Sequence, residues 1–210
     1  LNFIGNQYSN AVWQAHIDLM VKNNIRLSVN FLIDEFVIDP NIEKNKENGT
    51  AGSYRIAYTM INTSGHILLI NSTYVKVGTP TFRHSNGYNN FVNQNTPLGW
   101  NKGSDATELQ IGFTYFNRKN IISSISFNTF NIGEENILTR PYDPYYDYYI
   151  GAFPSGKIMK RVGIESSIEW WWRPNVSFLI LSNLESDDTD KIKFNFLFSV
   201  DASIEKLISI

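Results

Sequence analysis

The chain has 210 residues, about the length of one domain, and its 18 Lys and Arg against 20 Asp and Glu give a formal charge of −2. Aromatic residues make up 14% and charged residues 18%, which argues against a disordered chain, and the lack of a basic excess argues against a nucleic-acid-binding protein. There is no cysteine, which excludes disulfides, thiolate metal sites and cysteine nucleophiles.

Apolar and polar residues alternate along most of the chain. In the first such segment, Trp13, Ile17 and Leu19 have one parity, whereas His16 and Asp18 have the other. A β-strand places two such sets on opposite faces of a sheet. The alternation predicts nine strands and gives no convincing helix. In chain order the predicted strands are 13–21, 25–37, 53–60, 66–78, 108–115, 120–131, 161–172, 175–184 and 191–200.

Each predicted strand has one apolar face and one face of hydroxyl, amide and charged groups, and two all-β architectures fit this pattern. In a soluble β-sandwich, the apolar face forms the core and the polar face meets water. In a membrane β-barrel, the apolar face meets lipid and the polar face lines a wet lumen. The alternation alone leaves both open. The longest aliphatic run, 67–70, has four residues, whereas a membrane-spanning helix needs roughly 20.

The lengths of the connections favour the barrel. Short and long joins alternate along the chain, at 22–24, 39–52, 62–65, 79–104, 117–119, 133–157, 173–175 and 185–190. Outer-membrane barrels have tight turns at the periplasmic end and extended loops at the external end. We therefore expect an all-β fold, an antiparallel up-and-down transmembrane β-barrel segment of about nine strands.

Aromatic residues cluster next to the short joins. Trp170, Trp171 and Trp172 precede the turn at 173–175, and Tyr115 and Phe116 precede the turn at 117–119. Amphipathic rings favour the membrane–water interface, so this placement is typical of an aromatic girdle, with ordinary strand-end packing as the alternative. Cross-strand pairs inside the barrel are expected for the charges on the polar faces, which are Arg26, Asp34, Arg55, Glu108, Glu165, Glu169, Lys191 and Lys193.

The odd number of strands determines on which side the ends of the barrel segment lie. If the short turns face the periplasm, the first and the ninth strand both run inward, and residues 1–10 lie outside. A complete bacterial barrel has an even number of strands in one chain. We therefore expect residues 1–202 to be the carboxy-terminal part of a larger outer-membrane barrel, followed by a tail at 203–210.

Six segments, most of them in the predicted loops, carry a recognisable pattern: 5–10 (GNQYSN), 82–88 (FRHSNGY), 97–100 (PLGW), 104–109 (SDATEL), 140–145 (RPYDPY) and 153–156 (FPSG). The most specific element is Pro-Leu-Gly followed within ten residues by Asp-Ala-x-Glu-Leu at the start of a predicted strand. Together these segments resemble the capsule assembly Wzi family. The resemblance spans roughly residues 5–200 and is strongest in the loops.

This resemblance implies an eighteen-stranded outer-membrane barrel of Gram-negative bacteria that holds capsular or extracellular polysaccharide at the cell surface in a lectin-like way. It implies no catalytic activity. The implied partners are the polysaccharide and outer-membrane lipid, without nucleic acid, and the implied state is a monomeric barrel. The chain departs from the family because it covers only about half of the strands and has no equivalent of the small helical plug.

Two long predicted loops, 79–104 and 133–157, carry the candidate polysaccharide-binding residues. Sugar recognition uses aromatic rings for the apolar faces of pyranose rings, and amides or charges for the hydroxyl groups. The first loop offers both, and the second adds Arg and Tyr residues beside prolines that stiffen it. A structural role in pinning or plugging is the alternative for each residue. The candidates are Arg83, His84, Tyr88, Trp100, Arg140, Tyr142 and Tyr145.

The sequence predicts no enzyme, cofactor or metal site. Glu165 and Glu169 lie about 13 Å apart on one predicted strand, too far for the carboxylate pair of a retaining glycosidase. Gly-x-Ser-x-Gly and phosphate-loop motifs are absent, and three His leave little basis for a histidine-rich metal site. Two other functions stay open: a soluble β-sandwich that binds or cleaves glycans, and a barrel that conducts small solutes.

Overall fold

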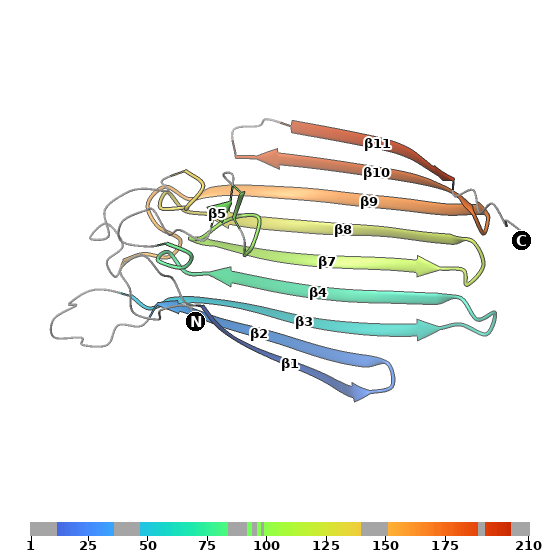
Figure 1. Cartoon of the computed structure of the whole chain (residues 1–210), viewed down its shortest axis with the longest axis horizontal. Helices are drawn as coiled ribbons and strands as arrows, with labels where there is room; N and C mark the ends of the chain where they lie inside the picture. The colour runs from blue at the N-terminus through green and yellow to red at the C-terminus, as the bar shows by residue number, and fades with distance from the viewer. Residues whose placement is uncertain are drawn as a thin grey trace, which may run out of the picture.

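One antiparallel sheet contains nine of the eleven strands (Figure 1). The structure, a computed structural model, describes residues 12–35, 47–83, 92–93, 96–97, 99–139, 151–188 and 192–202. No helix long and apolar enough to cross a membrane occurs in these residues. The strands of the sheet, in their spatial order, are β1 Trp13–Lys22, β2 Ile25–Glu35, β3 Gly49–Ile61, β4 Ile67–Val77, β7 Ala106–Phe116, β8 Ile121–Ile132, β9 Met159–Arg173, β10 Val176–Asp187 and β11 Ile192–Ala202.

The prediction of nine antiparallel up-and-down strands is confirmed, and each strand of this sheet pairs with the strands of the sheet that precede and follow it in the chain. Strand β3 is longer than predicted and begins at Gly49, because its first residues pair with β2 through Leu32 and Ala51 and through Ile33 and Thr50. Small residues carry little hydropathy alternation, so the sequence pattern misses this extension. A short separate hairpin, β5 Val92–Asn93 with β6 Thr96–Pro97, was also not predicted.

The predicted alternation of short and long connections is confirmed for the first seven joins, whereas the eighth, 188–191, was predicted to be of the longer kind and has only four residues. The joins at 23–24, 62–66, 117–120 and 174–175 are short and lie at one end of the sheet (Figure 1). The joins at 36–48, 78–105 and 133–158 are long, and the strand ends that flank them lie at the opposite end, as do the strand ends that flank the join at 188–191. We call these the short-turn end and the long-loop end.

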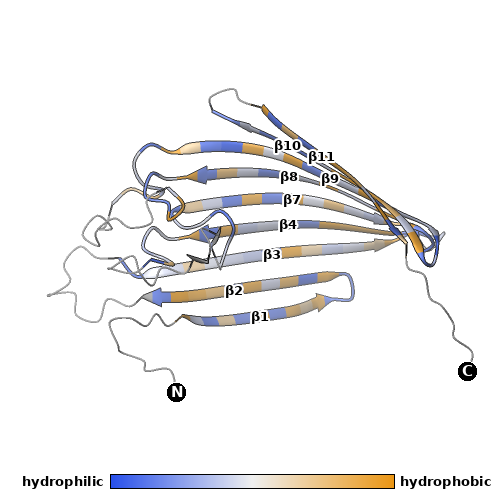
Figure 2. Ribbon diagram, turned by 45° about the horizontal axis from the view of Figure 1, so that its top comes forward, coloured by the Kyte–Doolittle hydropathy of each residue, from blue (hydrophilic) through white to orange (hydrophobic). Residues whose placement is uncertain are grey.

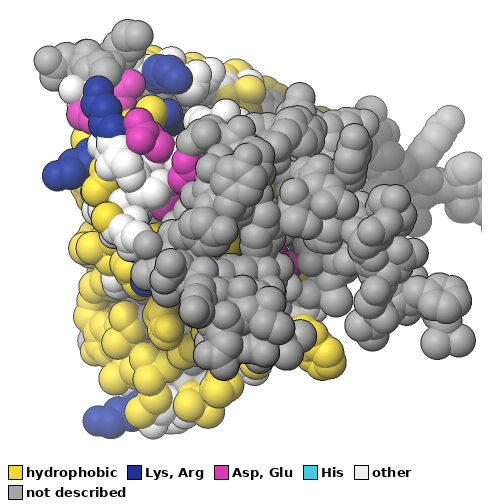
Figure 3. Space-filling view, turned by 90° about the vertical axis from the view of Figure 1, so that its left-hand side faces the viewer, with side chains coloured by type: hydrophobic (Ala, Val, Ile, Leu, Met, Phe, Trp, Pro, Cys, Tyr) yellow, Lys and Arg dark blue, Asp and Glu magenta, His cyan; other side chains and the backbone are white. Residues whose placement is uncertain are grey.

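Hydrophobic and hydrophilic residues alternate along the strands (Figure 2), and the register places the two sets on opposite faces of the sheet. On the apolar face, Phe31 and Ile111 are each 43% exposed, Val162 is 57% exposed and Phe196 is 60% exposed. Seen from the long-loop end, hydrophobic side chains gather along one outer side of the molecule (Figure 3). The described residues contain no second layer against this face, so the β-sandwich alternative is wrong for this part of the chain.

Aromatic rings stack across neighbouring strands at the short-turn end of the apolar face. The ring centroids of Trp170 and Phe178 lie 5.5 Å apart, and those of Phe178 and Phe198 lie 6.5 Å apart. Trp172, on the same face and closer to the turn, is 57% exposed. The predicted aromatic cluster therefore exists at this end of the sheet.

Cross-strand ion pairs occur on the polar face. Arg26 pairs with Asp18, and Arg161 Nη1 lies 2.9 Å from Glu185 Oε1. Hydroxyl groups also bond across strands, with Ser124 Oγ 2.7 Å from Ser167 Oγ. Arg26 thus forms a cross-strand pair as predicted, with Asp18 on β1.

The turn between β7 and β8 is closed by one side chain. Asn117 Oδ1 accepts hydrogen bonds from the backbone N–H groups of Lys119 at 2.9 Å, Asn120 at 2.9 Å and Ile121 at 3.0 Å. The turn also holds Arg118 at a φ of 59°. A side-chain amide that replaces backbone acceptors in this way is a common means of stabilising a tight turn.

We predict that Asn117→Ala lowers the free energy of unfolding by about 1 kcal/mol, because three backbone donors lose their acceptor at an exposed turn. Asn117→Asp keeps the acceptor oxygen and serves as the matched control. The measurement is the urea midpoint of the full-length protein refolded in lipid vesicles. Equal midpoints for the Ala and Asp variants would contradict this role of the side-chain oxygen.

Candidate functional site

A small hydrophobic cluster lies at the long-loop end. Val77, Phe82 and Ile137 are its buried members, from the end of β4 and from two loops. Leu32, Ala51, Val75 and Trp100 pack against it. The register places Leu32, Ala51 and Val75 on the face that is polar elsewhere, so this cluster draws the loops over the polar face.

Asp105 anchors three chain segments beneath the loops. Its side chain is fully buried, and its backbone has a φ of 52°. The carboxylate accepts hydrogen bonds from Thr79 Oγ1 at 2.9 Å, from the N–H of Ser155 at 3.0 Å and from the N–H of Glu135 at 3.2 Å, and also from Ser155 Oγ. A Cβ on Gly133 would lie 1.9 Å from Asp105 Oδ2, so only glycine fits beside this carboxylate.

The start of the loop 78–105 is fixed by buried polar contacts. The backbone N–H of Phe82 donates to Asp34 Oδ2 at 2.5 Å. Arg83 is 2% exposed, and its Nη1 lies 3.5 Å from Glu135 Oε2. Arg83 was predicted to bind polysaccharide, with a structural role in pinning the loop as the alternative. The structure places Arg83 in this loop-anchoring network.

Trp100 lines a cavity of about 690 Å³ on the polar face. The ring is half-buried and packs against the hydrophobic cluster. Apolar members of the cluster line the same cavity, and the polar groups that face it include Gln14, Asn30 and Thr73. An aromatic ring beside amide and hydroxyl groups is the combination that carbohydrate recognition uses.

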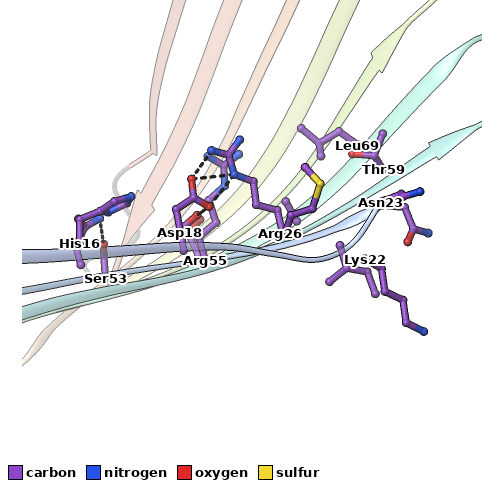
Figure 4. Close-up of a pocket in the computed structure, with 16 residues that line it drawn as sticks. His16, Asp18, Lys22, Asn23, Arg26, Ser53, Arg55, Thr59 and Leu69 are labelled. Carbon is purple, nitrogen blue, oxygen red and sulfur yellow. Dashed lines mark hydrogen bonds and ion pairs between the residues drawn. The ribbon is translucent and has the colours of Figure 1, made fainter.

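A second cavity, of about 640 Å³, continues along β1 to β4 (Figure 4). It holds the Asp18–Arg26 pair, in which Arg26 Nε donates to Asp18 Oδ1 at 2.8 Å. Farther toward the long-loop end, His16 Nδ1 lies 2.7 Å from Asn30 Oδ1, and Asn30 Nδ2 donates to Ser53 Oγ at 3.2 Å. These contacts fix the polar side chains on three adjacent strands.

The structure therefore brings Trp100 to a cavity and buries Arg83, while the other predicted binding residues lie outside the described part of the chain. These are His84, Tyr88, Arg140, Tyr142 and Tyr145. Sequence reasoning missed Gln14, Asn30 and Thr73, although they have the parity of the polar face. No group of three or more His, Asp or Glu among the described residues is arranged to hold a metal ion.

Comparison with protein-family models, with curated proteins and with solved structures finds no match. The resemblance to the capsule assembly Wzi family stays a prediction that rests on the loop segments. The fold itself, one antiparallel sheet of nine up-and-down strands, is given by the structure independently of that resemblance.

We predict that Asp105→Ala releases the loops at the long-loop end while the nine-stranded sheet persists. Several buried donors would lose their acceptor, at a cost of about 1–3 kcal/mol for each group left unsatisfied. Limited proteolysis of the full-length protein in detergent should then cleave within 133–158 many times faster than in the wild type.

Asp105→Asn is the matched control, because Asn adopts the same backbone φ readily and keeps one acceptor oxygen. Its cleavage rate should fall between those of the wild type and the Ala variant. A cleavage rate of Asp105→Ala equal to that of the wild type would contradict the anchoring role.

Proposed function

We propose that this chain forms part of the wall of an outer-membrane β-barrel that attaches or assembles capsular or extracellular polysaccharide at the cell surface, without catalysis. The observation that carries the proposal is the uncovered apolar face of the sheet. The partners are outer-membrane lipid on that face and the polysaccharide at the long-loop end.

The membrane location is supported by the way in which hydrophobic side chains are distributed. Soluble monomers rarely expose large continuous apolar patches. Here such residues follow the apolar face across all nine strands, whereas the buried hydrophobic residues of the described chain are only Val77, Phe82, Ala106, Phe130 and Ile137. Lipid in contact with the apolar face would remove it from water, which is the arrangement of a transmembrane barrel.

The orientation is supported by the two unlike ends. Outer-membrane barrels have short periplasmic turns and long external loops, flanked by aromatic girdles. We assign the short-turn end to the periplasmic side, and the Trp170, Phe178 and Phe198 stack at that end fits one of the two girdles. The long-loop end, with the Trp100 cavity, then faces the cell exterior, where the polysaccharide is.

Binding rather than chemistry is supported by the groups that surround Trp100. A half-buried ring packed against the hydrophobic cluster offers a fixed platform for a sugar ring, and the amides of Gln14 and Asn30 offer donors and acceptors for hydroxyl groups. This combination matches the lectin-like role that the loop resemblance implies.

We predict opposite labelling of two adjacent positions on β9. The natural chain has no cysteine, so Ile164→Cys and Glu165→Cys each provide a single reactive thiol. Ile164 has the parity of the apolar face and Glu165 that of the polar face, and both side chains are exposed in the chain itself. In lipid vesicles a water-soluble maleimide should label Glu165→Cys many times faster than Ile164→Cys, because lipid shields only the apolar face.

Unfolding in detergent provides the control for this experiment, because both thiols should then react at similar rates. Equal labelling of the two thiols in the folded, vesicle-bound protein would place both faces in water. That outcome would overturn the membrane location.

We also predict that Trp100→Ala combined with Tyr88→Ala lowers capsule retention by cells several-fold while the barrel still inserts. The change removes two rings on which pyranose faces stack. Capsule retained on washed cells is the measurement. As a control, Trp172→Ala with Tyr58→Ala removes the same ring types from the apolar face, and cells with this variant should retain as much capsule as wild-type cells. Unchanged capsule retention in the Trp100→Ala, Tyr88→Ala variant would reject this loop as the binding site.

A further inference from the structure

The two cavities on the polar face form one continuous groove. They share Asn30, Ser53 and Thr73, which lie on β2, β3 and β4. Ser53 and Arg55 are two residues apart on β3, which is about 7 Å along the strand. The groove therefore runs from Trp100 at the long-loop end toward the charged residues farther along β1 to β4.

The two ends of the groove have different chemistry. At the Trp100 end, the lining combines an aromatic ring with neutral amides and hydroxyls, and it includes no charged side chain. At the other end, two basic residues, Arg26 and Arg55, stand against one acidic residue, Asp18. Lys22 also borders this end, but the register pairs it with Ile25, so its side chain lies on the apolar side of the sheet. Lys22 lies by the turn, away from the Asp18–Arg26 pair (Figure 4). The charged end thus has a net positive charge.

Arg55 is the cation that this end of the groove leaves available. Arg26 is held by Asp18 through Nε and Nη2. Arg55 is exposed on the same face, beside Thr73 in the register, and the described residues provide it with no hydrogen bond or ion pair. A guanidinium group offers a planar pair of donors that fits a carboxylate group in a bidentate manner.

We propose that this groove binds a segment of an acidic polysaccharide, with a sugar ring against Trp100 and the carboxylate of a uronic acid at Arg55. This inference rests on the proposed function and extends it from the external loops to the polar face. It also specifies the chemical class of the glycan, which the loops alone do not.

A polysaccharide is favoured over an anionic lipid because of the side on which the groove lies. Lipid would contact the apolar face, whereas Trp100 and Arg55 are on the opposite, polar face. The net positive charge of the groove complements a polyanion and would repel a cationic glycan. Neutral amides between the two ends then match the hydroxyl groups of the intervening sugar.

The test is isothermal titration of the full-length protein, purified in detergent, with oligogalacturonate and with maltodextrin of the same length as the neutral probe. We expect the wild type to bind oligogalacturonate more tightly than maltodextrin. Arg55→Gln should weaken oligogalacturonate binding by about tenfold, because it removes a charge-assisted hydrogen bond, and should leave maltodextrin binding unchanged.

Two further variants separate the charge at this position from other effects. Arg55→Lys keeps the charge but not the planar pair of donors, so its affinity for oligogalacturonate should be intermediate. Arg118→Gln removes an exposed cation from the β7–β8 turn, which does not line the groove, and should bind like the wild type. An unchanged heat-modifiable band on gels shows that each variant still folds.

Equal oligogalacturonate affinity for the wild type and Arg55→Gln would overturn the proposal, and so would a wild type that binds neither glycan. After either outcome, the proposed attachment function would still be supported if capsule retention depends on Trp100 and Tyr88. The failure of the groove and the failure of the proposed function are thus distinguishable.

Discussion

The stability of this sheet depends on what covers its apolar face. Removing apolar surface from water contributes about 25 cal/mol per Å², and most folds achieve this by packing a second layer on the sheet. The described residues supply no such layer, and their buried apolar cluster is confined to the surroundings of Val77, Phe82 and Ile137. Hydrocarbon around the sheet would take the place of the missing layer. The proposed location therefore follows from a property of the whole face rather than from any single residue.

The parity of the strands sets a second constraint. Nine up-and-down strands leave β1 and β11 running in the same direction, and neither has a partner on its outer side among the described residues. Unpaired backbone groups cannot remain in hydrocarbon. Pairing β1 directly with β11 would produce a parallel seam in an otherwise antiparallel sheet. A barrel that is antiparallel throughout needs an odd number of further strands between these two edges.

The sheet was predictable because apolar and polar residues follow a period of two along most of each strand, and because most connection lengths fall into two classes. The loop anchor was not predictable. Asp105 and Ser155 are 50 residues apart in the chain, and their contact depends on the register of the strands between them and on a positive φ that an Asp residue tolerates. Likewise, the apolar residues Val75 and Val77 break the alternation of β4. Only the structure shows the reason, which is that loop side chains pack on them.

That break in alternation connects the fold with the groove. Leu32, Ala51 and Val75 form an apolar patch on the polar face at the long-loop end, and the rings of Phe82 and Trp100 pack there because water is excluded from both surfaces. Farther along the same strands the side chains are small and polar, as at Ser53 and Thr73, so the loop residues find no apolar support and the space stays open. A change from apolar to polar residues on one face thus decides both where the loops are held and where a groove remains for a ligand.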